Sequence, residues 1–217
     1  MSAESGVKTF RDSGGLWEGH DVMEVASPDG FRNNPDLVLD FYNQRRRQLK
    51  EVTPNLGHLN IAKLEESFDV HVITQNVDDL HERAGSTNIV HLHGELRKVR
   101  STVYPNKIYN WEEDLILGDT CDDGTQLRPH IVWFGEAVPM IESAIEIVEQ
   151  ADVLVIIGTS MQVYPAASLV NFVNDDIPIY FIDPFPNLNP SHYVNDIIII
   201  EDTAVNGTEK LLKMLAG

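Results

Sequence analysis

Polar side chains follow one of the apolar runs of this 217-residue chain, at a point where they could bind a small molecule. Gln75, Asn76 and Asp78 come just after Val70–Thr74. If that run is a strand of an α/β sheet, its carboxyl end faces the ligand crevice of the fold. Amide and carboxylate groups suit sugar hydroxyls and a carboxamide. The alternative is a helix N-cap, with Asn76 or Asp78 accepting from free backbone N–H groups.

A second junction of this kind is Gly158-Thr159-Ser160, which follows the apolar run Val153–Ile157. A strand, a glycine and hydroxyl residues ahead of a helix can offer N–H groups and hydroxyls to a phosphate or a ribose. An ordinary turn with a serine cap explains the same residues. The chain has neither the GxGxxG nor the Walker pattern, so this segment is a weak signal by itself.

Two histidines, His91 and His93, stand two residues apart before Gly94. Strand alternation predicts that both lie on one face. A histidine at a strand end could act as a general base, because its ordinary pKa lies near neutral pH. A structural, hydrogen-bonded histidine is the alternative. A metal ligand has less support, since no cysteine or acidic residue stands at a convincing spacing.

Arginines in two places could bind anions. Arg11, next to Phe10, lies in a glycine-rich opening segment and could bind a phosphate with its fork of donors, or lie on the surface. Tyr42 and Arg45 are three residues apart on a predicted helix and share its apolar face, at least approximately. Together they could bind a small carboxylate, although a solvated charged face is the usual explanation of such a run.

These residues need a scaffold, and the apolar pattern predicts one. Short runs rich in Val and Ile alternate with longer amphipathic stretches, which favours an α/β fold with a parallel sheet covered on both faces. The predicted strands are Val70–Thr74, Ile89–His93, Ile131–Phe134, Val153–Ile157, Ile179–Ile182 and Ile197–Ile200. The predicted helices are Pro35–Glu51, Asn55–Phe68, Val77–Ala84, Met140–Gln150, Pro165–Asn174 and Thr208–Leu215.

Two regions interrupt this alternation. Glu95–Pro129 is rich in turn residues and predicts a small inserted lobe, and residues 1–34 show no periodicity, which predicts a long loop. The length predicts one domain over residues 1–217. Within it we expect the inserted lobe at about residues 95–130, a helical part at about 28–68, and a Rossmann-like remainder.

Charge and cysteine content exclude several classes of function. The chain has 16 Lys and Arg against 34 Asp and Glu, a formal charge of −18, which argues against nucleic acid or an anionic membrane as partner. Cys121 is the single cysteine, so an intramolecular disulfide and a zinc site of several thiolates are excluded. The first twenty residues contain no apolar core, and no aliphatic run is long enough to cross a membrane. We therefore expect a cytoplasmic protein.

Taken together, five segments resemble the sirtuins, the NAD-dependent protein-lysine deacylases. They occur in the family's order and nearly span the chain, so the set is far more specific than any one member. The segments are Ser2–Arg11, Thr74–Gly85, His91–Gly94, Val132–Glu136 and Gly158–Ser160.

The resemblance implies a Rossmann-like domain with a small lobe, and NAD and acyl-lysine meeting in the cleft between them. It implies that NAD is a co-substrate and that acylated-lysine peptides or proteins are the partners. The residues that would contact NAD are Phe10, Arg11, Gln75, Asn76, Asp78, Gly158, Thr159, Ser160, Asp183 and Ala204. Val132, Trp133, Phe134 and Gly135 would pair with the substrate peptide as an added strand.

His93 corresponds to the family's catalytic base, which activates a ribose hydroxyl after the acyl oxygen has displaced nicotinamide. Tyr42 and Arg45 resemble the Tyr-x-x-Arg pair of the class III bacterial branch, which prefers succinyl- and malonyl-lysine. The resemblance thus predicts a desuccinylase and demalonylase that releases O-acyl-ADP-ribose. The alternatives are a non-catalytic module that binds NAD or ADP-ribose, and ADP-ribosyl transfer to a protein.

The sequence departs from the family in two places. Most sirtuins have two Cys-x-x-Cys pairs that bind a structural zinc, and their positions in this chain fall near Ser101, Tyr104, Cys121 and Gly124. We therefore expect no structural zinc. We expect the small lobe to be packed instead by Trp111, Leu115, Ile116 and Leu117. The family's first strand and its Gly-Ala-Gly turn would precede Ser2, so we expect that strand to be missing from this chain. Either the start codon was chosen too far downstream or the strand has been lost.

Overall fold

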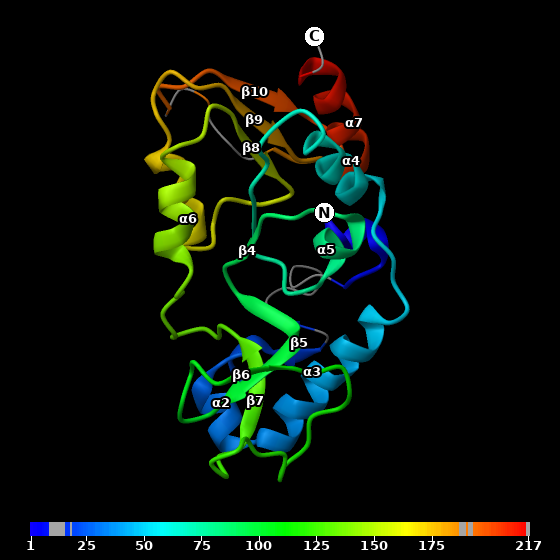
Figure 1. The fold of residues 1–217 in the computed structure, drawn as a ribbon, viewed down its shortest axis with the longest axis vertical. Helices are drawn as coiled ribbons and strands as arrows, with labels where there is room; N and C mark the ends of the chain where they lie inside the picture. Colours follow the sequence, from blue (N-terminus) through cyan, green and yellow to red (C-terminus); the bar gives the residue numbers. More distant parts are fainter. Residues whose placement is uncertain (9–15, 18, 187–189, 191–192, 216–217) are drawn as a thin grey trace.

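The structure is a computed structural model that describes residues 1–8, 16–17, 19–186, 190 and 193–215. Its described elements form two lobes (Figure 1). The larger lobe holds the parallel strands and most of the helices, and the smaller lobe is an antiparallel sheet packed against helices from the first fifty residues. The predicted α/β class with a small lobe is confirmed.

The parallel strands of the larger lobe lie in two groups. Strand β3 (Val72–Thr74) pairs with β4 (Ile89–His91). Strands β8 (Leu154–Ile157), β9 (Ile179–Ile182) and β10 (Ile197–Ile200) form the second group, in the order β10-β9-β8. Because all of these pairings are parallel, the strands of each group end on the same side, as a crevice at their carboxyl ends requires.

Helices cover both faces of these strands, which is why the strand sequences are continuously apolar. On one side α4 (Leu56–Leu64) and α7 (Ala204–Leu215) pack on β9 and β10, through a cluster that includes Ile61, Ile182 and Leu211. On the other side α6 (Ile141–Val148) and the 3-10 helix η2 (Ala166–Phe172) pack on the β3–β4 pair. The short helix α5 (Leu80–Ala84) follows β3.

The smaller lobe is built on β5 (Gly94–Ser101), which pairs antiparallel with β6 (Ile108–Asn110) and β7 (Leu127–Ile131). Helix α3 (Pro35–Leu49) packs against this sheet, and the short helices α1 (Val22–Val25) and α2 (Pro28–Asn33) pack on α3. Ser27 and Asn34 cap α2 and α3, each followed by a proline in the first turn, as is typical of helix starts.

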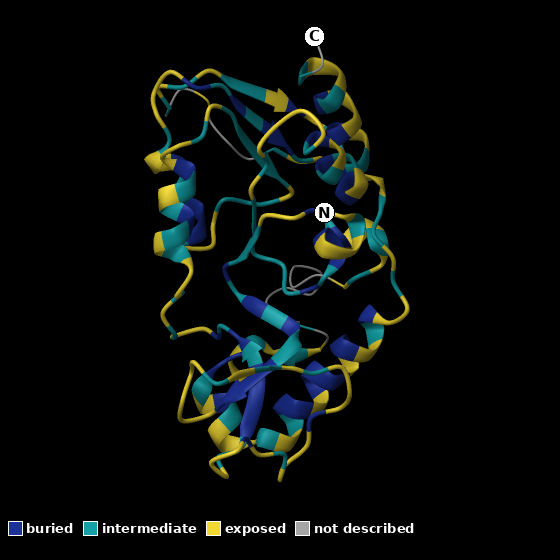
Figure 2. Ribbon diagram, viewed as in Figure 1, coloured by how far each residue is buried: buried dark blue, intermediate teal, exposed yellow. Residues whose placement is uncertain are grey.

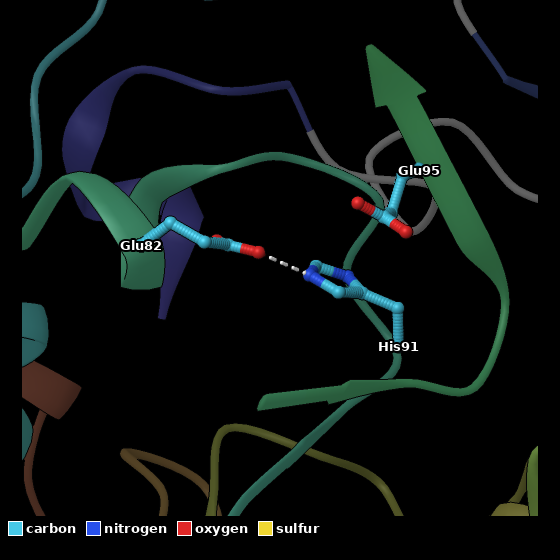
Figure 3. Close-up of side chains that lie close together, drawn as sticks. All are labelled: Glu82, His91 and Glu95. Atoms are coloured by element: carbon cyan, nitrogen blue, oxygen red, sulfur yellow. Dashed lines mark hydrogen bonds and ion pairs between the residues drawn. The ribbon is translucent and has the colours of Figure 1, made fainter. Parts of the chain in front are cut away.

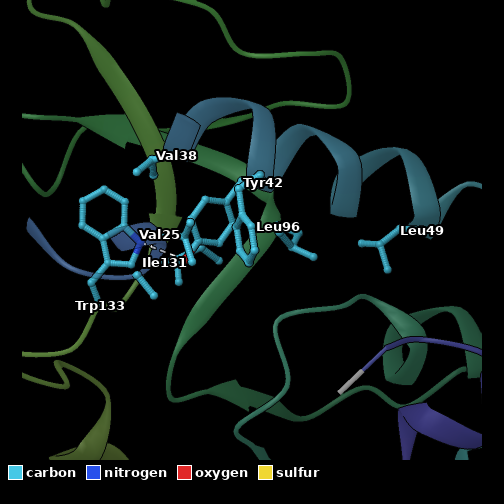
Figure 4. Close-up of a cluster of buried hydrophobic side chains, with 9 residues drawn as sticks. Val25, Val38, Tyr42, Leu49, Leu96, Ile131 and Trp133 are labelled. Atoms are coloured by element: carbon cyan, nitrogen blue, oxygen red, sulfur yellow. Dashed lines mark hydrogen bonds between the residues drawn. The ribbon is translucent and has the colours of Figure 1, made fainter. Parts of the chain in front are cut away.

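The core of the smaller lobe joins α3 to β5 and β7 (Figure 4). Phe41 and Tyr42 lie edge to face, and Tyr42 also contacts Trp133, which follows β7. Figure 2 shows β5 and β7 mostly buried, with exposed loops at the outer end of the lobe. No helix among the described residues is long and apolar enough to cross a membrane.

Several sequence predictions are wrong in detail. Residues 1–34 hold short elements in place of one long loop: the 3-10 helix η1 (Ser2–Ser5), the paired strands β1 (Leu16–Trp17) and β2 (His20–Asp21), α1 and α2. Each is shorter than two turns of helix or a strand of average length, so none produces a visible period. The strand predicted at Ile131–Phe134 shares only Ile131 with β7, because the chain leaves the sheet after that residue and turns at Phe134.

The helical part of the small lobe also ends earlier than predicted. Helix α4 packs on α7 and on strands of the large lobe, so of the predicted helical part at about 28–68 the small lobe holds only the helices up to Leu49. Of the four residues expected to pack this lobe, Leu115 is buried and Trp111 packs beside it. Ile116 and Leu117 are exposed.

Hydrogen bonds and ion pairs link the positions where the family's zinc ligands were expected. Ser101 Oγ lies 2.7 Å from Thr125 Oγ1, and Cys121 Sγ lies 2.8 Å from the same hydroxyl. The Lys107 ammonium lies 2.9 Å from the Asp122 carboxylate and 2.7 Å from that of Asp123. The acidic groups beside Cys121 therefore already have a cationic partner within the chain.

We therefore predict that the folded protein needs no zinc. Less than about 0.1 zinc ion per chain should be found by elemental analysis, and 1,10-phenanthroline should leave the Tm unchanged, because a structural zinc contributes directly to folding. One zinc per chain, or a chelator-induced fall in Tm, would contradict this.

Candidate functional site

A cleft of about 1030 Å³ lies between the two lobes. It brings together most of the residues singled out in the sequence. Those that line it are Tyr42, Arg45, Gln75, Asn76, Asp78, His93, Val132, Trp133, Phe134, Gly135, Gly158, Thr159, Asp183 and Ala204. Ser160 does not line it, and Phe10 and Arg11 lie outside the described residues.

The segment after β3 is held in place by side chains from the chain's first turn. The Asn76 amide donates to Ser2 Oγ over 2.9 Å, and Ser2 also hydrogen-bonds the Asp78 carboxyl. Burial raises the pKa of Asp78, and hydrogen bonds from Ser2 and from the Leu80 amide oppose that rise. The Asp78 carboxylate accepts from the Leu80 amide in the first turn of α5, whose N-cap residue is Asp79, and Asp78 also lines the cleft.

His93 is arranged as a neutral base. Its Nδ1 lies 3.1 Å from the Gln75 carbonyl oxygen, which fixes the proton on Nδ1 and leaves the lone pair on Nε2. Burial lowers the pKa of His93, partly opposed by this hydrogen bond. Since His93 also lines the cleft, a neutral imidazole faces the space where a ligand would bind.

The junction after β8 offers fewer free donors than its sequence indicates. Gly158 has a φ of 62°, a conformation that favours glycine, but its amide donates to the Ile182 carbonyl. Thr159 Oγ1 accepts from the Met161 amide. The Gly158 amide is therefore not available to a ligand, whereas the Thr159 hydroxyl keeps its hydrogen to donate.

Two further predicted residues stand at the ends of large-lobe elements. Asp183 follows β9, and its carboxylate accepts from the Phe185 amide over 2.8 Å. Ala204 begins α7, where its amide donates to the Glu4 carboxylate. Glu4 thus already fills the positive N-terminus of α7, so a phosphate is not needed there.

Tyr42 and Arg45 both lie on the inner side of α3. Burial raises the pKa of Tyr42, so its phenol stays protonated near neutral pH. The Trp133 indole N–H donates to the Tyr42 oxygen over 3.0 Å, which leaves the phenol hydrogen to donate in another direction. The Arg45 guanidinium stacks on the Phe41 ring, 3.2 Å from its centroid, and lies 5.1 Å from that of Trp17.

The segment from Val132 to Gly135 is anchored by its own amides. The Val132 amide donates to the His93 carbonyl, and the Phe134 amide donates to the Ala26 carbonyl. The Trp133 amide donates to the Glu136 carboxylate. A peptide strand added here would therefore rely on carbonyl oxygens and on Gly135.

Glu136 holds this segment against two buried arginines. Its carboxylate lies 2.7 Å from Arg128 and 3.1 Å from Arg100, and the Arg128 guanidinium stacks on Trp133. Burial disfavours the charged form, yet the hydrogen bonds from Arg128 and Trp133 and both arginine charges lower the pKa of Glu136 overall. Its contribution to stability is therefore present above its unfolded pKa and lost as the pH falls through the folded value.

Replacing Glu136 with glutamine should lower the free energy of unfolding by about 3 kcal/mol at pH 7, because two buried guanidinium groups lose their counter-charge. Urea unfolding measures this. The exposed Glu142→Gln on α6 is the control and should change stability by less than about 0.5 kcal/mol. Equal effects of the two substitutions would show that the network contributes nothing.

Sequence reasoning missed several residues that line the cleft. Trp17, Tyr164 and Phe185 belong to it, and the last two are exposed aromatic side chains. Trp17 is in a two-residue strand with no recognisable pattern. The aromatic residues beside Pro165 and Asp183 were a usable signal, since large exposed apolar groups often mark binding surfaces.

Comparison with known proteins agrees with this architecture. The Sir2 family model matches residues 1–165. An "NAD-dependent protein deacylase" of Helicobacter pylori strain 26695 is 59% identical over 215 residues, covering 99% of this chain and 93% of the relative. One from Bacteroides thetaiotaomicron is 53% identical over 221 residues, covering 99% and 94%.

Solved structures give the same result. A complex of a Sir2 homologue with NAD has a TM-score of 0.87 at 39% identity, covering 99% of this chain and 85% of that one. A Sir2 protein bound to acetylated peptide has a TM-score of 0.79 at 27% identity, covering 99% and 89%. The family match over most of the chain and these relatives show that the chain belongs to the Sir2 family.

Proposed function

We propose that this protein is an NAD-dependent protein-lysine deacylase that prefers succinyl- and malonyl-lysine. The observation that carries the proposal is that one cleft is lined by His93, by the amide and carboxylate groups that follow β3, and by the Tyr–Arg pair of α3. Relatives that match nearly the whole chain are named NAD-dependent protein deacylases, which supports the general activity.

The groups at the carboxyl ends of the strands fit NAD as co-substrate. Gln75, Asn76 and Asp78 supply donors and acceptors for a carboxamide and a ribose, and Asp183 stands where an acidic residue can accept from ribose hydroxyls. Gly158 has no side chain that would obstruct the close approach of NAD to the backbone. NAD would supply the ribose carbon to which the acyl oxygen bonds, and nicotinamide would leave as its bond to that carbon breaks.

His93 performs the proton transfer. With Nδ1 held by the Gln75 carbonyl, Nε2 can take the proton of a ribose hydroxyl as that oxygen attacks the acyl-derived carbon. Water then releases the deacylated lysine and O-acyl-ADP-ribose. The lowered pKa keeps His93 neutral across the neutral range, which is the form that this step needs.

The acyl preference rests on Tyr42 and Arg45. A guanidinium can give a carboxylate two parallel hydrogen bonds, and the Tyr42 hydroxyl can add a third. The aromatic rings of Phe41 and Trp17 hold the Arg45 side chain in place from the side. A succinyl or malonyl group ends in such a carboxylate, whereas an acetyl group does not.

Coupling between NAD consumption and the acyl-lysine peptide tests the proposal. Nicotinamide release from NAD should require a succinyl-lysine peptide and should equal the lysine freed, mole for mole. Binding of NAD without release would favour the non-catalytic module. A gain of one ADP-ribose in the mass of an acceptor protein, without acyl loss, would favour ADP-ribosyl transfer.

The net charge of −18 supports peptides around lysine as partners and disfavours nucleic acid or anionic membrane. A chain with one cysteine cannot form the intramolecular disulfides that are typical of oxidising compartments. We therefore propose that the activity is cytoplasmic.

A further inference from the structure

The first histidine of the His-Leu-His-Gly segment, His91, makes two short contacts that the proposed mechanism does not use, and Figure 3 shows the one to Glu82. Its Nδ1 lies 3.1 Å from the Asn76 carbonyl oxygen, and its Nε2 lies 2.7 Å from Glu82 Oε1 on α5. The His91 side chain is 8% exposed and that of Glu82 is 40% exposed. The ring therefore bridges α5, β4 and the segment that carries Gln75, Asn76 and Asp78.

Both partners of this ring are hydrogen-bond acceptors. A neutral imidazole has one N–H and would leave a lone pair facing either the carbonyl or the carboxylate. Both contacts are favourable when both nitrogens of His91 carry a proton. The ring is then an imidazolium with Glu82 as its counter-ion.

The surrounding charges favour that form. Burial alone would oppose the charge, but the Glu82 carboxylate, the Asn76 carbonyl and Glu95 on β5 raise the pKa of His91 above its ordinary value. The other titratable groups that interact with it are Asp78 and His81. Burial lowers the pKa of His81 to about 4, so it remains neutral and adds no competing charge near pH 7.

A metal ion is the alternative explanation of the cluster of Glu82, His91 and Glu95, whose ligand atoms lie within 4.8 Å of one another. Two ligands of a tetrahedral zinc, each about 2.1 Å from the ion, would stand about 3.4 Å apart. The separation of 2.7 Å between His91 and Glu82 is that of a charge-assisted hydrogen bond. The geometry therefore favours a shared proton.

His91 and His93 act on neighbouring peptide groups. His93 binds the Gln75 carbonyl and His91 binds the Asn76 carbonyl, each through Nδ1 over 3.1 Å. The Asn76 amide group is tied to Ser2. We propose that His91, as an imidazolium paired with Glu82, is a positioning residue that fixes the Gln75–Asp78 segment for NAD binding. This inference rests on the proposed function only in taking NAD as the ligand.

Binding of NAD and of ADP-ribose, measured by calorimetry, tests the role. His91→Phe should weaken NAD binding about tenfold, since one charge-assisted hydrogen bond to the segment is lost, and should leave the KM for the acyl-peptide unchanged. His91→Asn, whose amide can donate from near the Nδ1 position, should recover affinity to within about threefold. His71→Phe, an exposed histidine beside Asp69 and before β3, is the matched control and should bind normally.

Nitrogen NMR of the ligand-free protein gives a readout that does not depend on activity. Both ring nitrogens of His91 should be protonated at pH 7, and Glu82→Gln should lower the His91 pKa by about one unit or more. A neutral His91 in the wild type, an unchanged pKa in Glu82→Gln, or unweakened NAD binding in folded His91→Phe would overturn the proposal. If the wild type binds NAD but releases no acyl group, the deacylase function fails while this proposal can still be tested.

Discussion

Alanine in place of His93 is expected to lower the kcat for deacylation by about 10²- to 10⁴-fold, the usual contribution of a general base. NAD binding should fall by no more than a few-fold, because the hydrogen bond from His93 to the Gln75 carbonyl joins two neutral groups, whereas the bond from the His91 imidazolium to Asn76 is charge-assisted. Steady-state kinetics with an acyl-lysine peptide, together with calorimetry for ADP-ribose, separates the two effects.

The pH dependence of the deacylation rate tests the role of His93 independently. Because burial lowers the pKa of His93, the active neutral form persists to lower pH than for an exposed histidine. The acidic limb of kcat/KM, which reports the free enzyme, should therefore lie below the ordinary histidine value of about pH 6.5. His71→Ala serves as the control and should leave both rate and profile unchanged. A His93→Ala variant that retains wild-type kcat would exclude this residue as the base.

Methionine in place of Arg45 is expected to reduce kcat/KM for succinyl-lysine peptides by about one to two orders of magnitude. The loss corresponds to a charge-assisted hydrogen bond of about 1.5–3 kcal/mol. Deacetylation should stay the same or increase, because an acetyl group has no carboxylate and a methionine side chain can cover the Phe41 ring on which the guanidinium stacks. Matched succinyl- and acetyl-lysine peptides of one sequence measure the change.

Two variants make this result interpretable. Arg32→Met removes a 73% exposed arginine from α2 and should change neither activity. Tyr42→Phe keeps the ring in the lobe core but removes the hydroxyl, so it should lower desuccinylation less than Arg45→Met does. Equal loss of both activities in Arg45→Met would rule out the carboxylate-binding role.

The strands and longer helices could be predicted because their residues repeat a pattern over several turns or cover both faces of a sheet. Pro35–Glu51 was expected and Pro35–Leu49 is observed, with Asn34 as its cap. The elements of residues 1–34 could not be predicted in this way. Helix α1 has four residues and is fixed by its packing against α2 and α3, not by a period of its own.

The site was predictable where polar residues end a strand and less so where tertiary packing decides. Gln75, Asn76, Asp78 and His93 meet as expected because β3 and β4 are parallel neighbours. Nothing in the sequence shows that Glu4 fills the N-terminus of α7, or that Trp133 donates to Tyr42. Both contacts join segments more than ninety residues apart and depend on the folded arrangement of the two lobes.

The most direct test of the account is the identity of the products formed from NAD and a succinyl-lysine peptide. Mass spectrometry should show O-succinyl-ADP-ribose, nicotinamide and the unmodified lysine peptide in equal amounts, and none of them in His93→Ala above a few per cent of the wild-type yield. Free succinate released without NAD, or a peptide that gains ADP-ribose and keeps its succinyl group, would contradict the proposed deacylase.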